Sequence, residues 1–460
     1  MVRLCNIMKD FMIKSKLTFN IVCWYFAFAV CLNLVSDLKA KHQIIQLAAD
    51  GAWTWFNDER AIIDDENIII GSLDSQGVAR VDVYNTKSKN RLAYPLSSWQ
   101  SKDDHDNPAL LKLNNGQLLA CYAKHNREKQ WYWRIADKTK NWYCWLPEKI
   151  FVTPAKATYC NLIQLSGENN RIYNFSRIIG WNPNIQYSDN NAQSWYEPFV
   201  LIKSGDDKTR PYVKYADNGI DRIDLLYTDG HPLNMPINNV YHLYYKGGNF
   251  YTTNETKIKS MGQVKESPLL PSDGTLIYDG NTEGRGWVWD LEYDKQGNPI
   301  ATFINSADHE IGNDLRYRYA RWNPLKKQWD QQQIAFAGKR LYESQNHYAG
   351  GITIDPEDVN TVFISCNVDP RTGNPNKTGR YQVFQGKTLD ANKTWDWKQL
   401  TFNTDVDNLR PFVPHNHKHK ICVIWFQGRY DSFTDFKQRL WVFSKNKIIK
   451  YDNQGIRNGI

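Results

Sequence analysis

The 460-residue chain has few cysteines, no CxxC pair and no long run of like charge. Five cysteines follow residue 43, an odd and widely scattered set that indicates neither a disulfide framework nor a zinc ribbon. We expect most of them to be buried small apolar side chains. They are Cys121, Cys144, Cys160, Cys366 and Cys422. The overall composition also excludes a disordered, collagen-like or coiled-coil protein.

Positive charge is concentrated at the start of the chain. The formal net charge is +8, and the first 43 residues account for +4 of it. No basic run remains in the rest of the chain to neutralise a phosphate backbone, so nucleic acid is not an expected partner. Aromatic residues, in contrast, make up 14% of the chain, an excess that would suit a sugar-binding protein.

Residues 1–40 have the pattern of an export signal. Lys14 and Lys16 precede the apolar segment 21–32 (IVCWYFAFAVCL), which is too short to span a bilayer comfortably and has the length of a signal-peptide core. We therefore expect a signal peptide over 1–40 and a secreted, periplasmic or cell-surface protein. A retained membrane anchor is the alternative, and Cys31 only weakly resembles a lipoprotein acceptor. No other segment approaches membrane length.

Residues 44–460 are expected to form one all-β domain. Short runs of β-branched and aromatic residues alternate with Gly, Asn and Asp turns, as in ENIIIGSLD, RIDLLYTDG and RLWVFS. Four turns end in tryptophans separated by 53, 134 and 66 residues: Trp142, Trp195, Trp329 and Trp395. Because 134 is twice 67, these separations indicate a period of about 50 to 67 residues, which matches one four-stranded blade. We therefore predict a seven-bladed β-propeller of four-stranded antiparallel blades.

Two of these turns, 188–195 and 388–395, resemble degenerate Asp-boxes of the pattern S-x-D-x-G-x-T-W. The first has Asn190 in place of the aspartate, whereas the second retains Asp390. In such a turn the polar side chain caps main-chain N–H groups and the tryptophan packs between strands. The motif therefore indicates the fold and says nothing about chemistry.

The most informative segment for chemistry is 103–126, DDHDNPALLKLNNGQLLACYAKHN. Asn115-Gly116 lies between two apolar runs and predicts a β-hairpin. Pairing set by this turn opposes residues whose numbers sum to about 230, and it would place His105 and His125 about 5 Å apart. Two adjacent imidazoles depress each other's protonation and keep at least one ring neutral near pH 7, as a base requires. The alternative is two solvated strand ends.

A second predicted hairpin, 158–177, places Tyr159 and Arg177 at its outer ends, the same relative position as the histidines. An arginine can bind a carboxylate through two hydrogen bonds, and a tyrosine hydroxyl can give or accept a proton when a cation lowers its pKa. Packing or surface roles are the alternative for each residue.

A third group follows in TRPYVKY and TDGHP, which contribute Arg210, Tyr212 and His231. His231 lies at a Gly-His-Pro turn. Its ring either has a functional role or caps the turn. His231, His242 and a distant cysteine are also candidate zinc ligands, although the spacing of the two histidines is wider than in compact zinc motifs.

In order and spacing these segments resemble the exported bacterial BNR-repeat proteins that include the seven-bladed propeller ulvan lyases. The matching strings run from AWTWFNDERAI through DDHDNPALL, CYAKHN, TYCNLIQLS, RIYNFSR, RPYVKY and TDGHP to YHLYY. Each string is modest alone, and the resemblance extends over nearly all of the chain after the leader.

This resemblance implies β-eliminative cleavage of an acidic, uronate-containing algal polysaccharide such as the sulfated rhamnose–uronate polymer ulvan. It assigns His105 and Tyr159 to the base and acid pair, and Arg177 to neutralising the uronate. The other implied substrate-binding residues are His125, Tyr212 and Arg210. His231 would belong to the cleft or to a structural zinc site found in some relatives, and calcium is the other structural ion considered.

The chemistry of uronate elimination independently requires such a set. Removing the C5 proton builds a second negative charge beside the carboxylate, so a cation must first bind that carboxylate. This route needs no cofactor. The alternatives are a rhamnose–uronate exolytic lyase, a glycoside hydrolase with two carboxylates across the scissile bond, or a noncatalytic sugar-binding propeller. We expect a monomer with no membrane contact beyond the leader.

Overall fold

The computed structural model describes residues 42–137, 144–205, 209–308, 311–390, 393–402, 405–418 and 421–445. The predicted signal peptide and Trp142 lie outside these residues. The chain divides into two units, Met1–Ile44 with Phe443–Ile460, and Ile45–Val442, and the second contains the fold and the candidate site. Within the described residues, no helix combines the length and the apolar character needed to cross a membrane.

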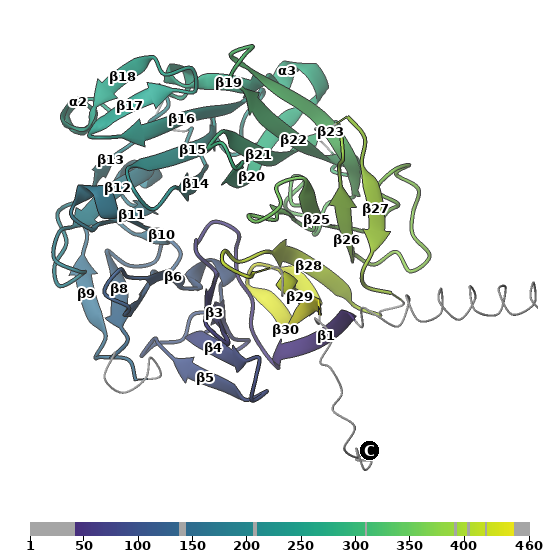
Figure 1. Ribbon diagram of the computed structural model, residues 1–460, viewed down its shortest axis with the longest axis horizontal. Helices are drawn as coiled ribbons and strands as arrows, with labels where there is room; N and C mark the ends of the chain where they lie inside the picture. Colours follow the sequence, from purple (N-terminus) through teal and green to yellow (C-terminus); the bar gives the residue numbers. More distant parts are fainter. Residues whose placement is uncertain are drawn as a thin grey trace, which may run out of the picture. The chain divides into compact units, whose positions relative to one another are not determined.

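Seven antiparallel sheets form a ring of blades in this unit (Figure 1). The first three sheets contain β2 (Ala61–Asp64), β3 (Asn67–Leu73), β4 (Ala79–Asn85) and β5 (Arg91–Pro95); β6 (Ala109–Lys112), β7 (Leu118–Tyr122), β8 (Gln130–Ile135) and β9 (Lys149–Val152); and β10 (Thr158–Leu165), β11 (Arg171–Arg177), β12 (Pro183–Ser188) and β13 (Phe199–Val200). The prediction of a seven-bladed β-propeller is confirmed.

The other four sheets complete the ring. They contain β14 (Val213–Asp217), β15 (Arg222–Thr228), β16 (Val240–Lys246), β17 (Asn249–Thr252), β18 (Lys257–Ser260) and β19 (Thr275–Tyr278); β20 (Arg285–Tyr293), β21 (Pro299–Ser306), β22 (Leu315–Asn323) and β23 (Gln328–Gly338); β24 (Ile352–Ile354), β25 (Thr361–Cys366), β26 (Gln382–Lys387) and β27 (Asp396–Gln399); and β28 (Asp407–Phe412), β29 (Ile421–Ser432), β30 (Asp435–Lys445) and β1 (His42–Ala48).

One blade departs from the predicted four strands. In the sheet that begins with β14, strand β16 pairs with β17 along its second half and with β19 along its first half, so the sheet has six strands. The additional chain also forms α2 (Met261–Glu266), and α3 (Gly280–Glu283) follows β19. Short 3-10 helices complete the structure: η1 (Asp104–Asp106), η3 (Ser166–Glu168), η4 (Ile179–Trp181) and η5 (Pro271–Asp273).

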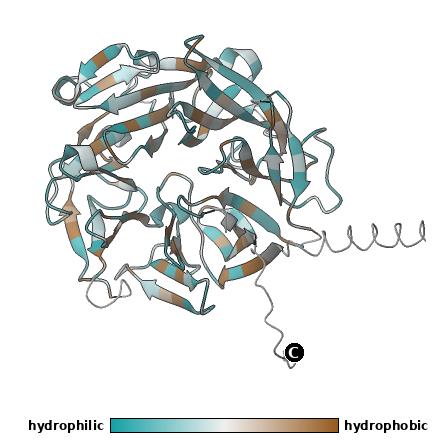
Figure 2. Cartoon of the chain, viewed as in Figure 1, coloured by the Kyte–Doolittle hydropathy of each residue, from teal (hydrophilic) through white to brown (hydrophobic). Residues whose placement is uncertain are grey.

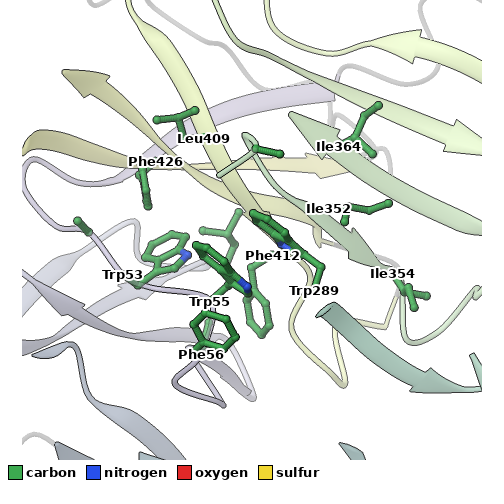
Figure 3. Packing of buried hydrophobic residues seen from close by; sticks show 14 of the residues in the cluster. Trp53, Trp55, Phe56, Trp289, Ile352, Ile354, Ile364, Leu409, Phe412 and Phe426 are labelled. Carbon is green, nitrogen blue, oxygen red and sulfur yellow. The ribbon is translucent and has the colours of Figure 1, made fainter. Parts of the chain in front are cut away.

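Strands rich in apolar residues, such as β10 and β21, are buried along their whole length, whereas β5 is mostly exposed. Figure 2 shows hydrophobic residues in every blade, with mostly hydrophilic connecting loops. The largest core cluster contains Trp53, Trp55 and Trp289 (Figure 3). The rings of Trp55 and Trp289 are stacked, with centroids 4.3 Å apart. Since Trp55 precedes β2 and Trp289 lies in β20, this contact joins blades that are distant in the sequence.

The two Asp-box turns have the predicted structural role. The Asn190 side chain accepts a hydrogen bond from the main-chain N–H four residues later at 3.0 Å, and Asp390 does the same at 2.9 Å. The Trp195 ring packs edge-on against Trp131 of the preceding blade, with centroids 5.1 Å apart. Each turn thus closes its own blade and supports the contact to a neighbour.

Three cysteines also follow the prediction, since Cys121, Cys160 and Cys366 are buried and unbonded. Cys144 is exposed, and the side chain of Cys422 lies outside the described part of the chain.

Candidate functional site

Six of the predicted site residues lie at one edge of three consecutive blades. The blades begin with β6, β10 and β14, and in each the first strand starts at the edge where the antiparallel second strand ends. His105 and Tyr212 lie just before first strands and Tyr159 lies at the start of one, whereas His125, Arg177 and His231 lie at or beyond the ends of second strands. The propeller topology therefore brings the two predicted hairpins and the third group together.

The histidine pair is closer than the hairpin ladder alone would make it. The predicted register is confirmed, because Ala109 pairs with Cys121, but pairing does not extend to the histidines. His105 lies in η1, and its ring stacks on that of His125 with centroids 4.1 Å apart. Asp103 accounts for this arrangement, since its two carboxylate oxygens lie 2.7 Å from His105 Nδ1 and 2.9 Å from His125 Nδ1.

The two rings have opposite pKa shifts. Burial lowers the pKa of His105, but the adjacent Asp103 and Asp104 carboxylates outweigh burial and raise it to about 10. Burial and the charge of His105 lower the pKa of His125 below its ordinary value. Near neutral pH, one ring of the pair is therefore an imidazolium and the other is neutral, in agreement with the prediction of at least one neutral ring.

Tyr159 is held against the histidines by an unusual backbone. It lies in a bulge of β10 with φ 61°, a left-handed conformation that is rare for an aromatic residue and often marks a functional position. Its buried ring has a centroid 5.7 Å from that of His105 and 6.3 Å from that of His125. Burial, followed by the neighbouring tyrosines, raises the pKa of its hydroxyl well above the ordinary value, so the phenol is neutral.

Arg177 presents a guanidinium to the same cleft. Arg177 is buried, with an exposed fraction of 6%. Its Nε donates to the main-chain oxygen of Trp181 at 2.8 Å. The guanidinium lies 4.1 Å from the ring centroid of Tyr212 and 5.5 Å from that of Trp181. In the described residues, no carboxylate or carbonyl accepts from its two Nη groups, which therefore remain for a ligand.

Arg210, between β13 and β14, binds the turn that follows Arg177. Its Nε donates to the main-chain oxygen of Gly180 at 2.8 Å, next to the carbonyl that holds Arg177. The half-buried Arg210 thus lies close to Arg177 at the rim of the cleft, and its substrate-binding role stays a prediction.

His231 also belongs to the cleft. Its ring lies 5.3 Å from Tyr212 and 4.8 Å from Trp287, measured between centroids. The main-chain N–H of Leu233 donates to His231 Nδ1 at 3.1 Å, so the hydrogen of the neutral ring is on Nε2. Burial, followed by the charges of Arg177 and His105, lowers the pKa of His231 to about 3 and keeps the ring neutral.

His242 lies outside this cluster, and the structure does not support a metal site made with His231. His242 is fully buried in β16, where its Nδ1 lies 2.8 Å from Thr253 Oγ1 and its Nε2 lies 2.8 Å from Asp224 Oδ1. Both ring nitrogens are thus engaged in hydrogen bonds.

We therefore expect His242→Ala to destabilise the fold by about 2–4 kcal/mol, because it leaves a cavity and unsatisfied hydrogen-bonding groups. Denaturant unfolding with and without a chelator measures this. The loss should be equal in the two conditions, and a chelator that destabilises only the wild-type protein would contradict the structural role.

The group best suited by residue type to a metal is Asp103, His105 and His125, whose ligand atoms lie within 4.8 Å of one another. Two nitrogens or oxygens bound to tetrahedral zinc would lie about 3.3 Å apart. The oxygen–nitrogen distances of 2.7 and 2.9 Å in this group are shorter than that, and they are typical of charge-assisted hydrogen bonds. The geometry fits a carboxylate shared by two imidazoles.

Several residues that surround the histidines were not predicted from the sequence. Asp103, Trp181 and Trp287 were not among the predicted site residues. Phe433, from the turn between β29 and β30, lies 5.2 Å from His105 and covers both rings. Asp103 could have been found from the DDHD string, but Phe433 belongs to the last blade and gives no local signal.

A small pocket and a larger cavity lie among the described residues. The small pocket is lined by Phe56, Tyr159, Arg177 and Tyr212, and so belongs to the cleft. The larger cavity of about 540 Å³ is lined by residues of β2, β6, β10, β14, β20 and β28 and contains none of the predicted site residues.

The fold and the site define a seven-bladed propeller with a histidine, tyrosine and arginine cleft at one edge of three blades. Residues 55–337 match the family described as BNR repeat-containing family member, and the chain belongs to this family. This confirms the family resemblance stated above.

Two similar solved structures agree with the fold. A structure of a polysaccharide lyase of family PL25, an ulvan lyase bound to -[GlcA(1-4)Rha3S]-, has a TM-score of 0.65 at 13% identity, covering 87% of this chain and 96% of that chain. A second structure of the PL25 ulvan lyase gives the same values. The K499G mutant of NanB sialidase from Streptococcus pneumoniae has a TM-score of 0.43 at 8% identity, covering 87% and 93%. No curated protein matches the chain.

Proposed function

We propose that the protein is a polysaccharide lyase that cleaves an acidic, uronate-containing polysaccharide by β-elimination. The observation that carries this proposal is the convergence of the stacked pair His105 and His125 with the phenol of Tyr159 and the guanidinium of Arg177. These are the groups that uronate elimination requires: a base, an acid and a cation for the carboxylate.

The cation acts first in this mechanism. The two Nη groups of Arg177 bind the uronate carboxylate, and its Nε is already fixed by Trp181. When the C5 proton leaves, charge moves onto the carboxylate oxygens, and a buried guanidinium stabilises it at the position where it develops. Arg177 therefore stabilises the transition state more strongly than the bound substrate.

Proton transfer completes the reaction. An imidazole of the histidine pair removes the C5 proton, the C4–C5 double bond forms, and the bond from C4 to O4 breaks. Tyr159 is a neutral phenol with a raised pKa, so it is suited to donate its proton to the departing O4. The products are a shortened chain and an unsaturated uronyl end.

Ulvan is the substrate that we propose. The similar PL25 ulvan lyase binds -[GlcA(1-4)Rha3S]-, a glucuronate linked to a sulfated rhamnose, and the likeness in fold supports a related polymer for this chain. The half-buried Trp181 offers an aromatic face on which a sugar ring can stack. Arg210 adds positive charge at the rim.

A glycoside hydrolase is less compatible with the same cleft. Such an enzyme needs two carboxylates across the scissile bond, but the carboxylates near His105 are all buried: Asp103, Asp104 and Asp106. Asp103 binds both imidazoles, and Asp104 binds Arg410 and Tyr430. These carboxylates bind and position other side chains of the protein, so they do not face a bound sugar.

The proposal predicts an ultraviolet signal. Incubating the purified protein with ulvan and other uronate polysaccharides should produce the absorbance of a C4–C5 double bond, because elimination creates one and hydrolysis does not. Carboxyl-reduced ulvan is the matched control and should give little signal. Reducing ends that appear without ultraviolet absorbance would indicate a hydrolase, and intact polymer that binds the protein would indicate a lectin.

A further inference from the structure

We infer that His125, and not His105, is the base of the proposed lyase, and that Asp103 is the positioning residue that gives the two rings different roles. This inference rests on the proposed function, but the protonation states that it requires can be measured without any substrate. It changes the expectation from the family resemblance, which assigned His105 to the base and acid pair.

The hydrogen bonds of Asp103 fix the tautomer of both rings. Asp103 is 2% exposed, and an ionised carboxylate can only accept hydrogen bonds. His105 Nδ1 and His125 Nδ1, at 2.7 and 2.9 Å from its two oxygens, must therefore both carry a hydrogen. A ring of the pair that is neutral then has its lone pair on Nε2, the nitrogen that does not face Asp103.

The arrangement of charge decides which ring is neutral. His105 faces two carboxylates, with Nδ1 2.7 Å from Asp103 and 3.1 Å from Asp104, and its side chain is 5% exposed. His125 contacts only the second oxygen of Asp103, and its side chain is 20% exposed. The first proton is bound by His105, and a second imidazolium at a centroid distance of 4.1 Å would be repelled.

The other groups that face His125 do not change this assignment. Asp106, a buried carboxyl, accepts the main-chain N–H of His125 at 2.6 Å, and in the part of the chain that the structure describes it forms no hydrogen bond or ion pair with the His125 ring. The rings of Tyr159, Trp181 and Phe433, which surround it, are uncharged. His125 is thus a neutral imidazole beside the imidazolium of His105.

Tyr159, His231 and His105 are excluded as the base by their hydrogens. Tyr159 is a neutral phenol, and His231 accepts from Leu233 at Nδ1 and so carries its hydrogen on Nε2. His105 carries a hydrogen on both nitrogens. Among the titratable side chains described in the cleft, His125 Nε2 is the ring nitrogen with an available lone pair.

The proton balance of the reaction follows. His125 Nε2 takes the C5 proton, the electrons of the C5–H bond form the C4–C5 double bond, and O4 departs with the proton of Tyr159. The imidazolium of His125 then returns one proton to the Tyr159 phenolate, which restores both groups. His105 remains protonated throughout, and as a fixed cation it assists Arg177 in stabilising the enolate-like charge.

The decisive experiment is histidine ¹⁵N NMR on the full-length protein without substrate. The His105→Gln and His125→Gln variants assign the two sets of signals. We expect His105 with both nitrogens protonated from neutral pH up to about pH 10, and His125 as the neutral Nδ1–H tautomer at pH 7. A neutral His105, or a charged His125, at that pH would overturn the inference whether or not the protein cleaves any polysaccharide.

The Asp103→Asn variant tests the positioning role. An amide removes the charge that both rings share, so the midpoint of the His105 titration should fall from about 10 toward the ordinary value of 6.5. His125 should also lose its fixed tautomer. If a variant that still unfolds cooperatively shows neither change, the inference is wrong.

The pH profile of kcat/KM on ulvan distinguishes a catalytic role from a structural one, because a residue with only a structural role would not shift the profile. A base must be deprotonated, so activity rises with pH through the pKa of His125, which lies below 6.5 in the wild-type protein. His105→Gln removes the adjacent cation and should shift this acidic limb to higher pH, whereas His125→Gln should remove the limb together with activity, by about 10²-fold to 10⁴-fold. An unmoved limb in His105→Gln would count against the assignment.

Discussion

Replacing Arg177 with glutamine is expected to lower kcat/KM on ulvan by about 10²-fold to 10³-fold, the loss typical of removing one donor from a developing anion. The guanidinium is buried, stacked on Tyr212 and fixed by the carbonyl of Trp181, and it pairs with no carboxylate in the described residues. Its loss therefore leaves no buried anion unpaired, and the fold should remain stable. Ultraviolet assays combined with thermal unfolding check both statements.

Arg171→Gln provides a matched control. Arg171 lies at the other end of β11, where its Nε pairs with Asp189 at 2.6 Å on the blade surface. This control should keep nearly full activity, because an exposed ion pair contributes little and lies far from the cleft along the strand.

Carboxyl-reduced polymer separates carboxylate recognition from general damage to the site. On acidic ulvan, Arg177→Gln should be much slower than the wild-type protein, and on the reduced polymer the residual rates of the two should be similar. An equal loss on both polymers would show that Arg177 does not act through the carboxylate.

The fold was predictable because its signals are local. The Asn115-Gly116 turn set the register of β6 and β7, and the side chains of Asn190 and Asp390 capped their turns as expected. The six-stranded sheet was not predictable, because β19 pairs with a part of β16 that is only available once β17 has turned away. The sequence of β19 does not indicate that this strand pairs with β16.

The parts of the site that two local hairpins bring together were predictable from the sequence. The parts that depend on contacts between the last blade and the second blade were not. Arg410 is fully buried and binds Asp104 at 2.6 Å, more than 300 positions away in the sequence, and Tyr430 binds the same carboxylate. These contacts fix η1, which carries His105. Because they join the last blade to the second, only the assembled propeller shows them, and the same holds for the cover that Phe433 provides.

Tyr159→Phe is expected to lower kcat on ulvan by about 10²-fold to 10⁴-fold, the range of a lost general acid. The phenyl ring keeps the contacts to His105 and Phe56, so binding and folding should change little. Tyr122→Phe is the matched control, since this buried hydroxyl binds Leu96 and Glu148 away from the histidines. That variant should lose some stability and little activity.

The role of Tyr159 as an acid also fixes the sign of its pH dependence. An acid must be protonated, so activity would be lost as pH rises through the pKa of the hydroxyl, and burial places that pKa well above 10. Ionisation of Tyr159 should therefore cause no alkaline limb below pH 10. A synthetic uronide with a nitrophenolate leaving group at C4 needs no acid, and it should restore the rate of Tyr159→Phe but not that of Arg177→Gln. If both variants recovered equally, Tyr159 would not be the proton donor to O4.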